Sequence, residues 1–170
     1  NLGYARNFLE TAKRCEGDWI AFCDQDDLWL PEKLAEAVSA IYGTPDCCMV
    51  LQNALLCNDD VKSRGQKFPN SLKPSIYNKE QQYGFWVWPG FLKTVSKGMF
   101  DLLCDEAMPR SWYPKEMELT HDKWTCLIAN ALGGIVVLGK PVALYRRHEG
   151  TVTGNYDQQS LGERMGKSRD

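Results

Sequence analysis

The sequence predicts an α/β domain with a mostly parallel sheet flanked by helices. Two short apolar runs, residues 18–23 and 47–52, have the length and composition of buried strands. Between them, apolar residues recur at the spacing of one helix face, at Leu34, Ala37, Val38 and Ile41. The order strand, helix, strand is typical of a parallel crossover, in which both strands point the same way.

Helical spacing and apolar runs also predict the remaining elements. Helices are expected over residues 4–14, after Pro89-Gly90 through Phe100 and Leu103, and from Trp124 to a stop at Gly133. Residues 57–83 are polar and dotted with Pro, Gly, Asn and Ser, which predicts a long connection of the kind that is either mobile or functional. Residues 135–148 predict one or two closing strands.

Composition limits the classes of protein that fit. A chain of 170 residues suits one domain, and its 44% hydrophobic and 25% charged residues are ordinary for a globular protein. The net charge of -2 offers no basic surface, so nucleic acid is not an expected partner. The 7 cysteines include no C-x-x-C pair, which favours reduced thiols in a cytoplasmic protein. No apolar run approaches the roughly 20 residues of a membrane span, and no signal peptide is recognisable.

Three carboxylates follow the first predicted strand, in the stretch "AFCDQDDLWLP". Asp24, Asp26 and Asp27 would then lie at the carboxyl end of a parallel strand, where open α/β sheets bind ligands. Carboxylates this close repel one another unless a cation lies among them, and a hard divalent ion suits oxygen ligands. The alternative is an acid-rich helix start, with Asp27 as the cap. An EF-hand is excluded, because Trp29 stands where that loop requires glycine.

Two motifs around this turn resemble a known family. "NLGYARN" (1–7) and "GDWIAFCDQDDLWLPEKL" (17–34) are similar to the N-x-G-x-x-x-A-R-N and G-D-x-I-x-F-x-D-x-D-D-x-W-x-P-x-K-L patterns of family 2 glycosyltransferases, although the first motif is one residue shorter between Gly3 and Arg6. The D-Q-D-D-x-W form most resembles the bacterial rhamnosyltransferase branch. The resemblance implies the GT-A fold, a Rossmann-like fold of nucleotide-diphospho-sugar transferases, truncated at its N-terminus and missing its first strands.

The resemblance also implies roles for the acidic turn. In such enzymes the D-x-D motif binds the nucleotide-sugar diphosphate through Mg²⁺ or Mn²⁺. By position, Asp26 would be a metal ligand, Asp24 would reach the ribose side or a metal-bound water, and Asp27 would support the turn. Arg6 matches the arginine that contacts the nucleotide, with a solvated helix arginine as the alternative.

A second acidic position lies in "ELTHDKWTCLIA", residues 118–129. The resemblance implies that Asp122 is the catalytic base of an inverting enzyme and that His121 belongs to the acceptor pocket. The chemistry needs such a base, because an acceptor hydroxyl must lose its proton as it attacks the anomeric carbon. The alternative for Asp122 is a helix-capping aspartate.

Two further segments carry weaker expectations. "LYRRHEGTVTG", residues 144–154, resembles the following segment of the rhamnosyltransferase-like branch. There His148 would complete the metal site or contact the diphosphate, and Arg146 and Arg147 would bind phosphate oxygens, with simple exposure in a basic loop as the alternative.

The aromatic run "FWVWPGF", residues 85–91, matches the region that shapes the acceptor pocket. Trp88 and Gly90 are the candidates there, and core packing is the equal alternative. Trp29 and Lys33 are expected to be structural, Trp29 by packing and Lys33 as an exposed helix residue.

Together with the residues that match it, the family resemblance implies a metal-dependent, inverting glycosyltransferase of cell-surface polysaccharide synthesis. The expected donor is dTDP-rhamnose or a UDP-hexose, and the acceptor a hydroxyl of a glycan or lipid-linked sugar at the inner face of the cell membrane. Peripheral membrane contact and oligomerisation fit this setting. The alternative is a non-catalytic sugar- or phosphate-binding module that retains the fold. A nucleotidyltransferase would need a Gly-rich phosphate loop, which the sequence lacks.

The predicted organisation is a partial domain over residues 1–155 and a polar, flexible tail over 156–170. Within the domain, residues 1–52 would bind the nucleotide and metal, and residues 85–155 would bind the acceptor and carry the base. The chain opens on Asn1 and lacks the segment that binds the nucleotide base in the family, so we expect a fragment with weak nucleotide binding and little activity.

Overall fold

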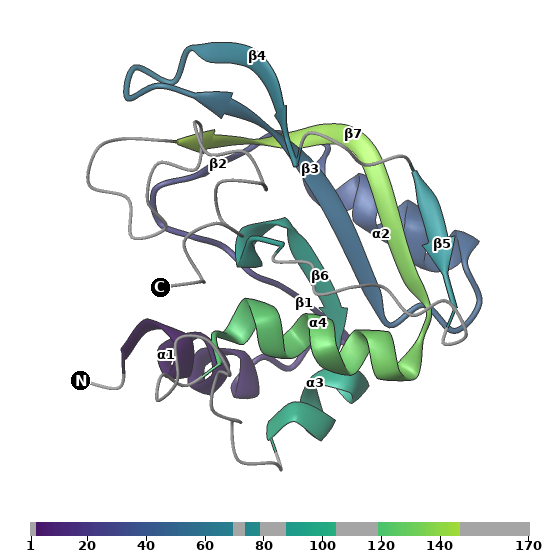
Figure 1. Cartoon of the computed structure of the whole chain (residues 1–170). Helices are drawn as coiled ribbons and strands as arrows, with labels where there is room; N and C mark the ends of the chain where they lie inside the picture. Colours follow the sequence, from purple (N-terminus) through teal and green to yellow (C-terminus); the bar gives the residue numbers. More distant parts are fainter. Residues whose placement is uncertain (1–2, 70–73, 79–87, 105–118, 147–170) are drawn as a thin grey trace, which may run out of the picture.

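The computed structural model describes residues 3–69, 74–78, 88–104 and 119–146, and the statements about structure below concern these residues. They form one curled sheet with helices on both faces (Figure 1). The helices are α1 (Gly3–Lys13), α2 (Lys33–Gly43), the 3-10 turn η1 (Gly90–Leu92), α3 (Lys97–Cys104) and α4 (His121–Leu132). The strands are β1 (Trp19–Ala21), β2 (Leu28–Trp29), β3 (Met49–Cys57), β4 (Ser63–Phe68), β5 (Ser75–Tyr77), β6 (Lys93–Ser96) and β7 (Ile135–Arg146).

The sheet is mixed, which corrects the prediction of a mostly parallel one. Its order is β1-β6-β3-β7-β2, with β4 beside β3 and β5 beside β7. Among the described strands only β3 and β7 pair in parallel, and the other pairs are antiparallel. The predicted crossover has the right direction, since β1 and β3 run the same way. They do not pair, however, because the antiparallel β6 lies between them.

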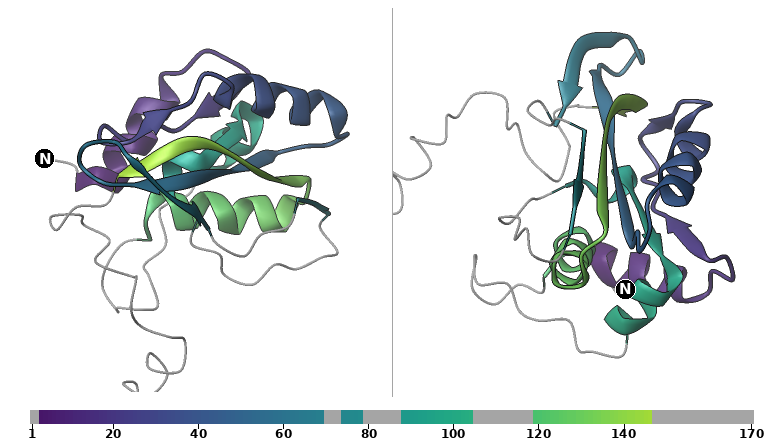
Figure 2. Two further views of the ribbon diagram at one scale, coloured as in Figure 1. Left: turned by 90° about the horizontal axis from the view of Figure 1, so that it is seen from above. Right: turned by 90° about the vertical axis from the view of Figure 1, so that its right-hand side faces the viewer.

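Alternation along the two longest strands divides the core into two layers. Met49 and Leu51 point to a large cluster that includes residues of α1, α4 and η1. Val50, between them, packs with Ala37 of α2 in a smaller cluster on the opposite face. Figure 2 shows α2 and α4 on opposite sides of the sheet. Both faces of β3 are therefore buried, which explains its continuous apolar run.

The predicted helices are confirmed, with two differences at their ends. The helix expected after Pro89-Gly90 forms as α3, but β6 comes before it. The helix after the acidic turn starts at Lys33, and the residue before it, Glu32, makes no side-chain cap. Asp27 is therefore not the cap, because β2 lies between it and the helix.

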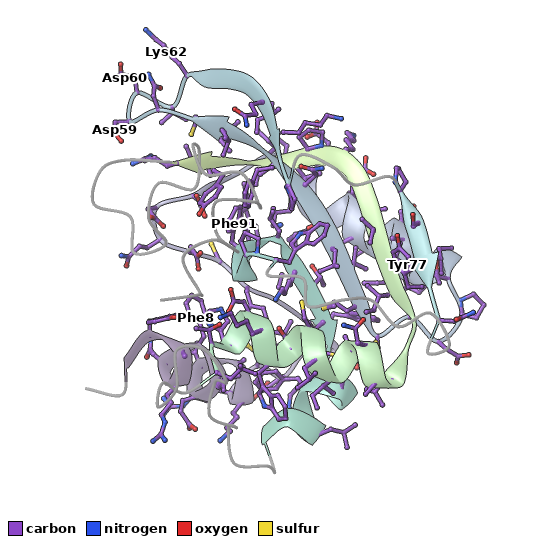
Figure 3. All side chains as sticks on the ribbon, viewed as in Figure 1. Phe8, Asp59, Asp60, Lys62, Tyr77 and Phe91 are labelled. Atoms are coloured by element: carbon purple, nitrogen blue, oxygen red, sulfur yellow. The ribbon has the colours of Figure 1, made fainter. Side chains whose placement is uncertain are left out.

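The connection over residues 57–83 includes two strands that the sequence did not predict. It contains β4, which forms a hairpin with β3, and β5, which pairs with β7. At the hairpin tip the Asn58 side chain accepts a hydrogen bond from the Lys62 amide, and the neighbouring Asp59 and Asp60 are exposed (Figure 3). The strand Ser63–Phe68 is polar, so it gives no apolar alternation by which a sequence reading could find it.

The closing segment forms one strand, β7, through Arg146. It begins directly after Gly134, whose amide donates to the Tyr77 carbonyl and whose carbonyl accepts from the Cys48 amide. Gly134 has a φ of 74°, and a Cβ there would overlap the main-chain carbonyl of Asp46. Three strands meet at this residue, and only glycine fits.

Gly134→Ala is therefore expected to lower the free energy of unfolding by more than about 2 kcal/mol, through the left-handed backbone and the overlap with Asp46. Gly98→Ala in α3 is the matched control, because a Cβ there meets no heavy atom within 4 Å. It should leave stability unchanged or raise it by up to about 1 kcal/mol. Urea denaturation measures both, and equal midpoints for the two variants would contradict the assignment.

Candidate active site

The acidic turn leaves the end of β1 and crosses to β2. Asp24, Asp26 and Asp27 are half-buried, whereas Gln25 between them is exposed. Burial, together with the charges of Asp26 and Asp122, raises the pKa of Asp24 to about 6. Burial also raises the pKa of Asp27 to about 7, although the Arg146 amide opposes this by donating to its carboxylate. The turn therefore concentrates acidic groups in a place that disfavours their charge.

Asp122 comes to this turn from the other half of the chain. It stands in the first turn of α4, half-buried, and its charge acts on Asp24. Its Oδ1 accepts a hydrogen bond of 2.9 Å from the amide of Lys123, the next residue, while Thr120 occupies the N-cap position. Asp122 is thus not the N-cap of α4. The two acidic segments that the sequence singled out share one electrostatic environment.

The end of β7 reaches the same turn. The Arg146 amide donates to Oδ1 of Asp27 at 3.0 Å, just beyond Leu28 and Leu144, the last residues that pair β2 with β7. Nε of Arg146 is buried and has no hydrogen-bond partner among the described residues. Arg146, one of the two arginines predicted to bind phosphate, therefore lies beside the acidic turn. Arg147 and His148, which follow, lie outside the described residues.

His121 is packed among aromatic rings next to Asp122. It is 5% exposed, and its ring stacks on Phe8 of α1 with 4.3 Å between centroids. Figure 3 labels Phe8, which lies beside the start of α4. Phe22 is a further ring neighbour, at 5.4 Å. Burial lowers the pKa of His121 to about 4, against the opposing charge of Asp122. This histidine is a neutral packing residue at neutral pH.

Gly90 makes room for the histidine ring. A Cβ at Gly90 would lie 2.5 Å from Nε2 of His121, closer than real contacts allow. Two of the three residues assigned to the acceptor pocket from the sequence are thus in direct contact. Neither Nδ1 nor Nε2 of His121 has a hydrogen-bond partner among the described residues.

Trp88 and Lys33 both join a buried polar cluster around Gln52. Trp88 is 2% exposed, and its indole donates to the Gln52 carbonyl at 2.9 Å. Trp88 therefore belongs to the core, which was the alternative to a place in the acceptor pocket. Lys33 is 1% exposed, so the prediction of an exposed helix lysine is wrong. Its ammonium donates to Oε1 of Gln52 at 2.9 Å and lies 5.0 Å from the Trp29 ring centroid. Burial lowers the pKa of Lys33 to about 8.

Comparison with known proteins assigns the chain to a family. The family model described as glycosyl transferase family 2 matches residues 1–103. The chain belongs to glycosyl transferase family 2. The match includes β1, the acidic turn and β6, and it ends before α4 and Asp122. The resemblance found in the two N-terminal motifs is thereby confirmed at the level of the family.

Individual relatives are more distant. The uncharacterised proteins Rv1520 of Mycobacterium tuberculosis and Mb1547 of Mycobacterium bovis are each 24% identical over 155 residues, covering 87% of this chain and 40% of the relative. The crystal structure of TarS 1–349 from S. aureus superposes with a TM-score of 0.56 at 19% identity, covering 86% of this chain and 41% of TarS. The chain thus spans about two fifths of their length, and the structural likeness supports the GT-A fold.

The family arginine candidate lies on α1. Arg6 is exposed, whereas Tyr4 and Phe8 of the same helix contact the His121 ring. Two residues correspond to about 200° around a helix, so Arg6 points away from that contact. Its role toward the nucleotide stays a prediction.

The acidic turn supplies carboxylates that could hold a metal ion. Within the described ranges, no three His, Cys, Asp or Glu side chains gather closely enough to hold an ion by themselves. Mg²⁺ in nucleotide sites is commonly held by one or two carboxylates together with the phosphates of the substrate. The half-buried oxygens of Asp24 and Asp26 suit that arrangement, and His148 lies outside the described residues.

Sequence reasoning missed Lys93, the first residue of β6. It is 0% exposed, and its ammonium donates to the main-chain carbonyl of Asp122. The only signal was a lysine inside the otherwise uncharged stretch from Gly90 to Ser96.

Of the helices that the structure describes, none is long and apolar enough to cross a bilayer.

The buried His121 predicts a loss of stability on acidification. The unfolded chain takes up a proton near pH 6.5, whereas the folded chain does so only near pH 4, so stability falls as the pH drops through this window. The wild type should lose up to about 3 kcal/mol more than His121→Gln across it. Urea midpoints measured along this pH range give the difference.

Asp24 and Asp27 act in the opposite direction, because their raised pKa values make protonation favour the folded state. Both residues are present in wild type and variant, so their contribution cancels in the comparison. Parallel pH profiles for the two proteins would contradict the buried neutral histidine.

Proposed function

We propose that the protein transfers a sugar from a nucleotide-diphosphate donor to a hydroxyl group of an acceptor. The observation that carries this proposal is the shared environment of Asp122 and the acidic turn, in a chain of glycosyl transferase family 2. Such a transfer needs a base on the acceptor side of the reacting carbon and, on the donor side, carboxylates that would hold a cation against the diphosphate. One side receives the donor diphosphate, and the other removes the proton of the acceptor.

On the acceptor side, Asp122 is the general base. A carboxylate is a weak base in water, but a half-buried one aimed at a hydroxyl serves when bond formation makes that hydroxyl acidic. Attack from the face opposite the leaving diphosphate inverts the anomeric carbon. Gly90 and His121 adjoin this base, and the family resemblance assigns both to the acceptor pocket.

On the donor side, Asp26 and Asp24 bind the diphosphate together with Mg²⁺ or Mn²⁺. When bound, the ion supplies positive charge to the leaving phosphate oxygens. Arg146 supports this assignment, because its amide donates a hydrogen bond to Asp27 and its Nε is buried without a partner among the described residues. Arg147 and His148 would extend the phosphate and metal contacts from the segment that follows.

The donor we favour is dTDP-rhamnose, with a UDP-hexose next, on the similarity of the D-Q-D-D-x-W stretch to the rhamnosyltransferase branch. The acceptor is a glycan or lipid-linked sugar of cell-surface polysaccharide synthesis, at the cytoplasmic face of the membrane.

Two substitutions test this assignment in the full-length protein. Asp122→Asn keeps the size of the side chain but removes the base, and Asp26→Ala removes the proposed ligand. Each should lower kcat for transfer or donor hydrolysis at least about 100-fold. Asp101→Asn, an exposed α3 carboxylate paired with Lys97, is the control and should retain full activity.

Full activity in Asp122→Asn would overturn the base assignment. Donor binding without any turnover in the wild type would favour a sugar-binding module instead.

Removal of divalent ions tests the donor side separately. A chelator should abolish turnover, and added Mn²⁺ or Mg²⁺ should restore it, because the leaving diphosphate lacks its counter-charge without the ion. Activity that persists unchanged in the chelator would overturn the metal proposal while leaving the base assignment intact.

A further inference from the structure

Lys93 contacts both halves of the candidate site. Its main-chain carbonyl accepts a hydrogen bond of 3.2 Å from the Phe22 amide, two residues before Asp24. Its ammonium donates to the Asp122 carbonyl and lies 3.3 Å from Oγ1 of Thr125. One residue therefore joins the end of β1 to the first turn of α4.

Thr125 extends this contact through the helix. Its hydroxyl lies within hydrogen-bond distance of the carbonyls of His121, at 2.9 Å, and Asp122, at 3.0 Å. Thr125 is 0% exposed, and its hydroxyl also accepts a hydrogen bond from the Lys93 ammonium. Lysine and threonine together engage both carbonyls of the residue pair that begins α4.

Stability alone does not explain a lysine at this position. A buried ammonium loses its hydration, and its partners in the part of the chain that the structure describes are a neutral carbonyl and a neutral hydroxyl. The positive end of the α4 dipole lies at the same place and further disfavours a cation. An unbranched apolar side chain of similar length, such as methionine, would fill the space without either cost.

We propose that Lys93 is a positioning residue that fixes Asp122 opposite the acidic turn. It ties the first turn of α4 to the strand that also holds the end of β1, so the two acidic segments keep a constant separation. This inference rests on the proposed function, in which Asp122 is the base. Small displacements of a base from its substrate are costly, because proton transfer depends on alignment.

Lys93→Met in the full-length protein tests the proposal. Its thermal midpoint should stay the same or rise, because a buried charge is removed. Amide hydrogen exchange over residues 119–126 should speed up, because the first turn of α4 loses its tether. The kcat should fall about 10- to 100-fold with little change in KM, since alignment rather than substrate binding is lost.

Two further variants make the test specific. Thr94→Val alters the neighbouring buried position of β6, whose hydroxyl has no partner among the described residues, and should change neither exchange nor kcat. Thr125→Val removes the second contact of the ammonium and should change both in the same direction as Lys93→Met, by less. It is also the test if Lys93→Met does not fold.

The outcomes separate this inference from the proposed function. Unchanged exchange over residues 119–126 in both Lys93→Met and Thr125→Val would overturn the tether. Full kcat in folded Lys93→Met, beside an inactive Asp122→Asn, would overturn the positioning role and leave the proposed function standing. An inactive wild type would overturn the proposed function, while the exchange data still decide whether Lys93 holds α4.

Discussion

The parallel pairing of β3 with β7 is the constraint on which the rest of the structure depends. It runs from Met49 opposite Ile135 to Cys57 opposite Arg146, through the centre of the sheet. Both faces of this pair are buried, so the register cannot slip without exposing one of the two core layers. The pairing fixes the end of β7, and thereby brings Arg146 to Asp27 across more than a hundred residues of sequence.

A second consequence concerns α4. The helix precedes β7, joined to it by Gly133 and Gly134, so the position of β7 sets where the helix ends. The start of the helix is set separately, by the packing of His121 against Phe8 and by Lys93 beneath the first turn. Asp122 is thus held from two directions, which is the support that its proposed role as a base requires.

Buried charge is the common chemical feature of this region. Lys33 and Lys93 are both inaccessible to solvent, and the carboxylates of Asp24 and Asp27 are held where burial raises their pKa values. A fold optimised only for stability would replace such groups by apolar ones. Their concentration on both sides of the acidic turn is the physical pattern expected of a functional site.

The sequence by itself determined the elements that depend on local pattern and the residues that carry the motif. The apolar spacing of α1, α3 and α4, the acidic turn and the position of Asp122 at a helix start were all predictable from neighbouring residues. The mixed direction of the sheet, the strand β4 and the burial of Lys33 were not. Those features depend on partners far along the chain. β6 separates β1 from β3, the polar strand β4 forms by pairing with β3, and the Gln52 side chain accepts a hydrogen bond from the buried Lys33 ammonium. Only the tertiary structure decided them, because strand partners and the cost of burying a charge are set by residues that no local window contains.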